Sequence, residues 1–260
     1  MLRPRITPCL LLSEGGLVKT VGFAAPKYVG DPINAVKIFN EKEADELVVL
    51  DIDAPRQGRA PNERLISQFA VECRMPLCYG GGIRTVEQVK RIIGLGVEKV
   101  SLGASAVETP DLISATAREI GSQSVVVVLD VRMVAGGRYE VFTHNGTRAT
   151  GLHPVAAAQA AEQRGAGEIL VNSIDRDGVM KGYDIELASM VRQATRLPLS
   201  VLGGAGSLTD LKALIERCGV IGAVAGSLFV FKGAYKAVLI NYPGHAQKED
   251  LIRTALSRPA

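Results

Sequence analysis

Eight short runs rich in valine, isoleucine and leucine alternate with amphipathic segments, and this alternation restricts the fold more than any other feature. Strands that alternate with helices form parallel sheets, and eight of them favour a closed (β/α)8 TIM barrel over an open sheet. The expected strands are Ile6–Leu12, Glu46–Asp51, Pro76–Gly80, Lys99–Leu102, Ser124–Asp130, Glu168–Asn172, Leu199–Leu202 and Gly222–Ala225. The chain has 260 residues, about the length of one barrel, so we predict one α/β domain over residues 1–260.

The expected helices lie between these strands, and several begin at good capping residues, such as Asp31 before Pro32. They are Pro32–Ala44, Asn62–Cys73, Thr85–Leu95, Pro110–Ile120, Val155–Arg164, Asp184–Thr195 and Leu208–Arg217. A glycine-rich loop at 15–30 and a hairpin at 138–150, turning at Asn145-Gly146, interrupt the pattern. The eighth helix is poorly marked, because 248–257 has only a weak helical pattern.

The two halves of the chain repeat each other. The stretch Glu46-Leu-Val-Val-Leu-Asp-Ile-Asp is echoed 122 residues later by Glu168-Ile-Leu-Val-Asn-Ser-Ile-Asp. The glycines that begin at Gly80 are echoed 123 residues later at Gly203. An offset near half the length indicates two (β/α)4 half-barrels that each present the same kind of site.

Composition and charge exclude several classes of function. Thirty basic residues against 27 acidic residues give a net charge of +3, which offers no electrostatic case for nucleic acid. No apolar run approaches the ~20 residues that span a bilayer, and the N-terminus lacks the cleavage region of a signal peptide, so we expect a cytoplasmic protein. The four cysteines form no CxxC pair and the three histidines are scattered, so we predict no metal site and no cofactor.

The rim at the carboxyl ends of the strands carries the candidate catalytic and binding residues, because α/β barrels place their chemistry there. The buried run 124–130 ends in Asp130, the candidate acid/base, unless it only caps a turn. Glycines that follow strands let backbone N–H groups approach an anion, although they also suit tight turns without a ligand. The candidate residues for a two-ended phosphorylated ligand are Gly81, Gly82, Gly103, Gly203, Gly204, Gly206, Gly226 and Ser227.

Further charged residues lie near both rims. Asp51, Asp175 and Asp177 share the rim of Asp130, and Lys19, in the glycine-rich loop, is placed to close over a ligand. At the opposite rim, charges precede four strands and would meet in an ion-pair ring: Arg5, Glu46, Lys99 and Glu168. From residue types alone, a stabilising role is favoured for this ring.

Several stretches resemble the cyclase subunit of imidazole glycerol phosphate synthase, the HisF type. They include Gly80-Gly-Gly-Ile-Arg, Ser173-Ile-Asp-Arg-Asp-Gly and Gly203-Gly-Ala-Gly, within about residues 3–230. The resemblance implies a duplicated barrel, with a glutaminase partner on its bottom face and ammonia passing through to the top. It makes the four-charge ring the gate of the ammonia tunnel, and it makes Glu98, beside Lys99, a candidate contact to the glutaminase.

The chain departs from that family on the top face. The family uses two aspartates as general acid/base groups, on strands one and five; the second matches Asp130, but Leu11 stands at the first. Leucine cannot transfer a proton, and loss of such a group typically lowers the rate about 10²–10⁴-fold. Glu14 is near but follows the strand, so we do not expect it to substitute. The family's Asn-Thr phosphate contact is replaced by Gly103-Ala104, and a serine by Leu202.

These departures leave three hypotheses. The chain resembles HisF-like proteins of surface-polysaccharide gene clusters, which implies an ammonia-conducting barrel that serves a third enzyme building an acetamidino group on a nucleotide sugar. The second hypothesis is a working cyclase of histidine biosynthesis. The third is a non-catalytic scaffold that only activates the glutaminase.

Overall fold

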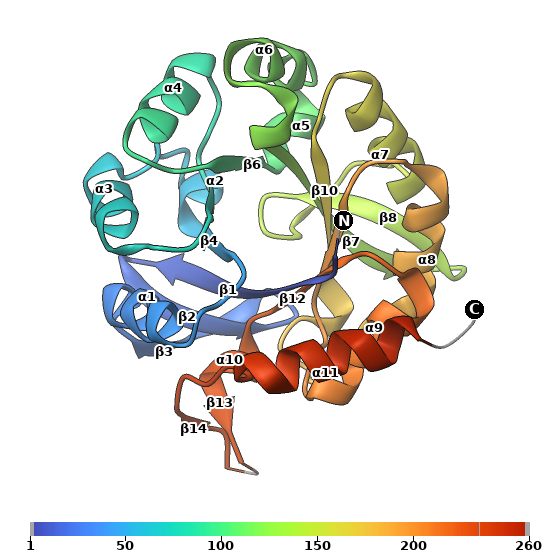
Figure 1. The fold of residues 1–260 in the computed structure, drawn as a ribbon. Coiled ribbons are helices and arrows are strands. Elements are labelled where there is room, and N and C mark those ends of the chain that lie inside the picture. The colour runs from blue at the N-terminus through green and yellow to red at the C-terminus, as the bar shows by residue number, and fades with distance from the viewer. Residues whose placement is uncertain (1–2, 234, 258–260) are drawn as a thin grey trace.

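The computed structural model of the protein describes residues 3–233 and 235–257 and confirms the predicted barrel (Figure 1). Eight parallel strands follow one another around the ring, and the parallel pair β7–β10 closes it. They are β1 (Arg5–Ser13), β4 (Leu47–Asp51), β5 (Leu77–Gly80), β6 (Lys99–Leu102), β7 (Val125–Val134), β10 (Glu168–Ser173), β11 (Leu199–Leu202) and β12 (Gly222–Ala225). Most strand bounds agree with the prediction to within one residue.

Helices surround the barrel, and the eighth one is present. The long helices are α1 (Pro32–Glu41), α3 (Glu63–Glu72), α4 (Val86–Gly94), α6 (Asp111–Ile120), α7 (Pro154–Gln163), α8 (Ile185–Ala194), α9 (Leu208–Cys218) and α11 (His245–Leu256). The pattern of α11 is weak because Lys248 occupies one of its buried positions, where its ammonium lies 2.6 Å from the Asp45 carboxylate. Short helical turns that the sequence did not indicate are α2 (Asp53–Gln57), η1 (Ser122–Ser124), α5 (Ala104–Glu108), η2 (Ile174–Arg176) and α10 (Ser227–Val230).

The glycine-rich segment 15–30 is not a loop, which corrects the prediction. It forms an antiparallel hairpin of β2 (Gly16–Val21) and β3 (Ala24–Gly30), and β2 also pairs with the end of β1. The apolar residues Leu17 and Val18 are buried there, and their burial favours strand structure over the irregular chain that the glycines suggested.

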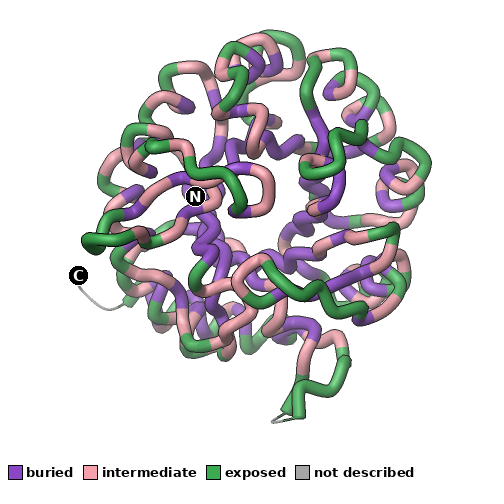
Figure 2. Tube along the Cα trace, turned by 180° about the vertical axis from the view of Figure 1, so that it is seen from behind, coloured by how far each residue is buried: buried purple, intermediate pink, exposed green. Residues whose placement is uncertain are grey.

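The second insertion also contains more strand than predicted. Strand β7 continues beyond Asp130 to Val134 and pairs with β8 (Arg138–Thr143), because Gly136 and Gly137 take the positive φ that this turn requires. The predicted turn at Asn145-Gly146 then joins β8 to β9 (Arg148–Ala149). A third hairpin, of β13 (Phe231–Lys232) with β14 (Ala237–Val238), was not indicated by the sequence and projects from the helical ring (Figure 2).

The half-chain repeat is visible in the fold. An extra hairpin follows the first strand of each half, β1 and β7, and a short helix follows the last strand of each half, β6 and β12. Helices α4 and α9 both begin with a capping box, at Thr85 and Ser207. These correspondences match the offset of 122 to 123 residues in the sequence.

Side chains inside the barrel lie in layers, because alternate residues of a strand point to the same side. On β10, for example, Glu168, Leu170 and Asn172 stand two residues apart and run from the bottom of the barrel to the top. The middle layer is apolar and includes Cys9, Val48, Cys78, Val126, Leu170 and Val224. Among the described residues, no helix is both long and apolar enough to cross a membrane.

Candidate functional site

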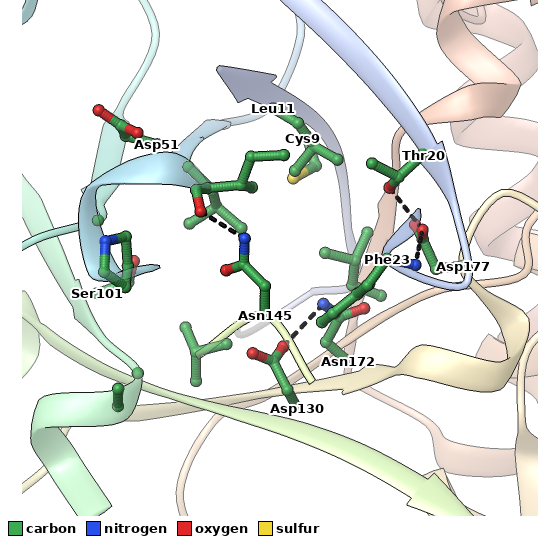
Figure 3. Close-up of a pocket in the computed structure, with 18 of the residues that line it drawn as sticks. Cys9, Leu11, Thr20, Phe23, Asp51, Ser101, Asp130, Asn145, Asn172 and Asp177 are labelled. Atoms are coloured by element: carbon green, nitrogen blue, oxygen red, sulfur yellow. Dashed lines mark hydrogen bonds between the residues drawn. The ribbon is translucent and has the colours of Figure 1, made fainter. Parts of the chain in front are cut away.

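A pocket opens at the carboxyl ends of the barrel strands, at the rim where the sequence placed the candidate residues (Figure 3). Most of those candidates line it, from both halves of the chain: Lys19, Asp51, Gly81, Gly82, Gly103, Asp130, Asp177, Gly203, Gly204, Gly226 and Ser227. Asp175 does not line it; its carboxylate accepts a hydrogen bond from the Met133 amide outside the pocket.

Asp130 lies in the pocket with a perturbed acidity. Burial raises the pKa of its carboxyl to about 7, an effect that a hydrogen bond from Asn172 Nδ2 at 3.0 Å reduces and the nearby Asp177 charge increases. A carboxyl with a pKa near 7 is half protonated at neutral pH, so it is suited to accept and donate protons.

Leu11 stands in the same pocket as Asp130 and brings no polar atom to it. Cys9, Leu50, Val128 and Leu202 line the pocket with it, so the surface around the carboxylate is largely apolar. Glu14 is exposed and does not line the pocket. In the described residues, no carboxylate takes the place that the family's first-strand aspartate would occupy.

Two corresponding turns of the repeat begin short helices at the pocket. Helices α5 and α10 begin at Gly103 and Gly226 without a side-chain cap. Lys19 lies in strand β2 rather than in a loop, which corrects its placement, and it is buried with its Nζ 2.7 Å from the Cys9 carbonyl oxygen. A Cβ on Gly226 would stand 2.7 Å from that Nζ, so the ammonium and the start of α10 lie side by side.

Gly206 and Asp51 have structural roles that the sequence did not indicate. Gly206 does not line the pocket; its N–H donates to the Asp210 carboxylate, and a Cβ there would collide with the Met180 carbonyl oxygen at 2.3 Å. Asp51 accepts hydrogen bonds from the amides of Asp53 and Ala54 and so caps α2. Its carboxylate faces the pocket with part of its hydrogen-bonding capacity already in use.

Two asparagines in the pocket were missed from the sequence. Asn172 pairs with Asp130 across the β7–β10 ladder, and its Oδ1 is buried without a partner. Its position as the polar last residue of a predicted strand was an available signal. Asn145, in the β8–β9 turn, reaches across the mouth to donate to the Ile52 carbonyl. That contact could not be inferred, because it joins two loops 93 residues apart.

Asp177 fastens the β2–β3 hairpin to the opposite side of the barrel mouth. Its Oδ2 accepts hydrogen bonds from Thr20 Oγ1 at 2.6 Å and from the Phe23 amide at 3.2 Å. Burial raises the pKa of Asp177 despite these bonds and the nearby Lys19. The carboxylate therefore holds the hairpin against the pocket that it also lines.

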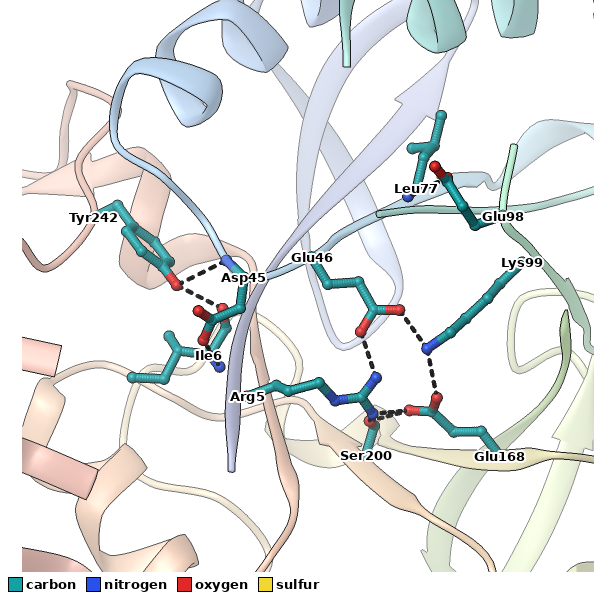
Figure 4. Close-up of polar contacts among 10 residues, drawn as sticks. All are labelled: Arg5, Ile6, Asp45, Glu46, Leu77, Glu98, Lys99, Glu168, Ser200 and Tyr242. Atoms are coloured by element: carbon teal, nitrogen blue, oxygen red, sulfur yellow. Dashed lines mark hydrogen bonds and ion pairs between the residues drawn. The ribbon is translucent and has the colours of Figure 1, made fainter. Parts of the chain in front are cut away.

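At the bottom of the barrel, the structure joins the four predicted charges in one closed ring (Figure 4). Arg5 donates to Glu46 at 2.6 Å and to Glu168 at 2.5 Å, and Lys99 lies 2.7 and 2.9 Å from the same two carboxylates. Burial alone would raise the pKa of Glu168, but the Arg5 and Lys99 charges outweigh it and hold that pKa below its usual value. The same carboxylates raise the pKa values of Arg5 and Lys99 above their usual values despite burial, so these two cations and Glu168 are charged at neutral pH.

Glu98 lies beside this ring but does not join it. Its side chain is exposed, and its Oε2 accepts a hydrogen bond from the Leu77 amide at 2.8 Å. That contact leaves a carboxylate oxygen at the bottom surface.

The barrel, the two-fold repeat and the glycine-rich pocket together define a duplicated (β/α)8-barrel protein with a pocket on its top face. The model of the family described as "Histidine biosynthesis protein" matches residues 5–236. The chain belongs to this family and is a barrel of the HisF type.

Several relatives resemble the chain over nearly its full length. "Putative imidazole glycerol phosphate synthase subunit HisF" of Leptospira interrogans is 58% identical over 96% of this chain and 99% of its own. "Putative imidazole glycerol phosphate synthase subunit hisF2" of Pseudomonas aeruginosa is 54% identical over 94% and 97%. "Imidazole glycerol phosphate synthase subunit HisF" of Hyphomonas neptunium is 43% identical over 89% and 91%.

Proposed function

We propose that this barrel receives ammonia from a glutaminase on its bottom face and delivers it at the top to an enzyme that forms an acetamidino group on a nucleotide sugar. The observation that carries the proposal is the pairing of Asp130 with Leu11 instead of a second acid, while the charged ring at the bottom is complete. A barrel that only needed to fold would not require such a ring, because a hydrophobic plug is often as stable as buried ion pairs.

The path between the ring and the pocket suits a small neutral molecule. The layer between them is apolar, with Val48, Val126 and Leu170 among its residues. A charged ammonium ion would lose its hydration there at high cost, whereas ammonia would not. Leu11 and Leu202 extend the apolar surface into the pocket, where the resembling cyclases have polar groups.

The pocket also retains features for a phosphorylated ligand. Lys19 and the uncapped amides of α10 converge at Gly226, and a cation next to a helix N-terminus is favourable when an anion lies between them. In the other half, the start of α5 has an open Gly103. We therefore infer that a phosphate group binds more tightly at the Gly226–Ser227 turn.

The second candidate function is the cyclase reaction of histidine biosynthesis. The pKa of Asp130 near 7 favours it, because that carboxyl could still act as an acid/base group.

The test is reconstitution of three proteins from the same source: this barrel, its glutaminase, and an ammonia-dependent enzyme that amidates a nucleotide sugar. With glutamine as the nitrogen source, we expect amidated sugar to form only when the barrel is present. In parallel, the barrel is given ammonium and the bis-phosphorylated ribotide substrate of the family. Rapid turnover of the ribotide, or rescue of a histidine auxotroph, would instead establish the cyclase.

A further inference from the structure

Two hairpins beside the pocket carry a concentrated set of exposed apolar side chains. Ten large hydrophobic residues are exposed in the described part of the chain, and five of them lie on the β2–β3 hairpin or on and just after β13–β14. Tyr28 is 67% exposed and Tyr235 is 99% exposed. Isolated exposed apolar residues are common, but a group of them marks a site of interaction.

The same two hairpins are basic. Lys27, Lys232 and Lys236 are exposed, and the sequence has no aspartate or glutamate in 15–30 or 227–248, although the chain has 27 acidic residues. The Lys27 ammonium lies 6.0 Å from the centre of the Phe231 ring, so the hairpins are neighbours. We call the surface formed by Lys27, Tyr28, Lys232, Tyr235, Lys236 and Val238 the hairpin surface.

The hairpin surface adjoins the pocket mouth and not the charged ring. Strand β2 contributes Lys19 and Thr20 to the pocket, and Ser227, which begins the helix before β13, also lines it. A protein bound to the hairpin surface would therefore be next to the top-face opening, at the opposite end of the barrel from Arg5 and Lys99.

We propose that the hairpin surface docks the ammonia-accepting enzyme, through a face of that enzyme that is acidic around an apolar centre. This proposal rests on the proposed function and names the place at which the third protein binds. Tyrosines are common anchors at protein interfaces, and lysines around them favour an acidic partner and speed its association. A second copy of this chain is disfavoured, because a two-fold contact would bring its lysines against their own counterparts.

The test uses the reconstituted three-protein system with Lys232→Glu/Lys236→Glu and, separately, Tyr235→Ser. All three residues are exposed, so we expect folding and stimulation of the glutaminase to be unchanged. The barrel concentration that gives half-maximal amidation from glutamine should rise about tenfold for the double variant and at least threefold for Tyr235→Ser. With external ammonium chloride, the acceptor enzyme should work equally well with every variant.

The matched control is Met133→Ser/Arg138→Glu, which alters one exposed apolar and one exposed basic residue on the β7–β8 hairpin. It should leave the half-maximal concentration unchanged. If wild type transfers ammonia and the hairpin variants transfer it equally well, the docking site is wrong and the function stands. If wild type transfers none, the function fails and the docking site with it. Binding to anionic phospholipid vesicles that depends on Lys232 and Lys236, without an effect on transfer, also overturns the proposal.

Discussion

At the scale of single residues, the pocket differs from an acid/base site by the side chain of Leu11. Asp130 has a pKa of about 7 and accepts a hydrogen bond from Asn172. In the described residues, the first strand offers no second carboxylate at the position of Leu11. A single residue, Leu11, thus accounts for the missing acid/base group, and replacing it with aspartate would restore that group.

We expect wild type to turn over the ribotide negligibly, and Leu11→Asp should raise any trace of this cyclase activity. Restoring a general acid/base group typically gives about 10²–10⁴-fold, and an increase of at least tenfold is expected here. The measurement is consumption of the ribotide with ammonium as the nitrogen source. Leu11→Asn, which has a similar size and no titrating proton, is the control. A wild-type rate equal to that of an ordinary cyclase would contradict the interpretation.

Asp130 should also make stability depend on pH. The unfolded chain releases this proton near pH 4, whereas the folded protein holds it up to about pH 7. The folded state therefore binds more protons between these values, and the contribution of this group to stability falls as the pH rises. Asp130→Asn should gain free energy of unfolding relative to wild type from pH 4 to 7, by at most about 4 kcal/mol. Urea unfolding at pH 5 and pH 8 measures it; equal differences at both pH values would contradict it.

At the scale of elements, the charged ring links the first residues of strands from both halves. Removing one member of a buried ion pair leaves a partner charge uncompensated. Lys99→Ala should therefore disturb the bottom of the barrel while the top-face pocket stays intact.

With glutaminase and acceptor present, Lys99→Ala should allow glutamine hydrolysis to continue while less ammonia reaches the acceptor. The measured quantity is the ratio of amidated product to glutamate at low free ammonium. Lys90→Ala removes another paired lysine, from the outer face of α4, and should leave the ratio unchanged. The same ratio for Lys99→Ala and wild type, in an intact complex, would make the ring a structural feature only.

One tyrosine in the segment between β12 and α11, Tyr242, attaches that segment to the barrel. The hydroxyl of Tyr242 donates to the Ile6 carbonyl at 2.7 Å and accepts from the Asp45 amide at 3.3 Å (Figure 4). Tyr242→Phe leaves both backbone groups without this partner, and we expect it to lower the free energy of unfolding by about 1–3 kcal/mol. Chemical denaturation measures the change, and Tyr28→Phe, at an exposed position, should have no effect. An unchanged free energy of unfolding for Tyr242→Phe would contradict this role.

At the scale of the whole molecule, the repeat predicts two anion sites of unequal strength. The site at Gly226–Ser227 has the Lys19 Nζ directly beside it, whereas no described atom lies within 4 Å of a Cβ placed on Gly103, and the cation on that side of the pocket is Arg84. Inorganic phosphate should therefore bind first at Gly226–Ser227, and Lys19→Met should weaken that binding at least tenfold. Crystals grown in sulfate and calorimetric titration with phosphate would measure this order; stronger density at Gly103 would reverse it.

The sequence predicted the barrel well because local pattern determines its strands. The runs at 46–51 and 199–202 could be recognised as strands from their own residues. Asp130 and the glycines could then be identified as site candidates because they stand at the ends of predicted strands. The hairpin at 16–30 was missed because glycines obscured two buried strand residues. Asn145 was missed because its partner Ile52 belongs to a distant loop. Helix α11 was only weakly indicated, because Lys248 is buried through a contact with Asp45.

The alternation of two cations and two carboxylates around the bottom ring has a consequence for the surrounding electric field. The ring carries no net charge, and its opposed pairs largely cancel each other's dipoles, so its field declines steeply with distance. The ring by itself therefore neither attracts nor repels a charged solute outside the barrel to any large extent. In the proposed ammonia path, ammonium would be excluded by the loss of its hydration at contact, which depends little on ionic strength.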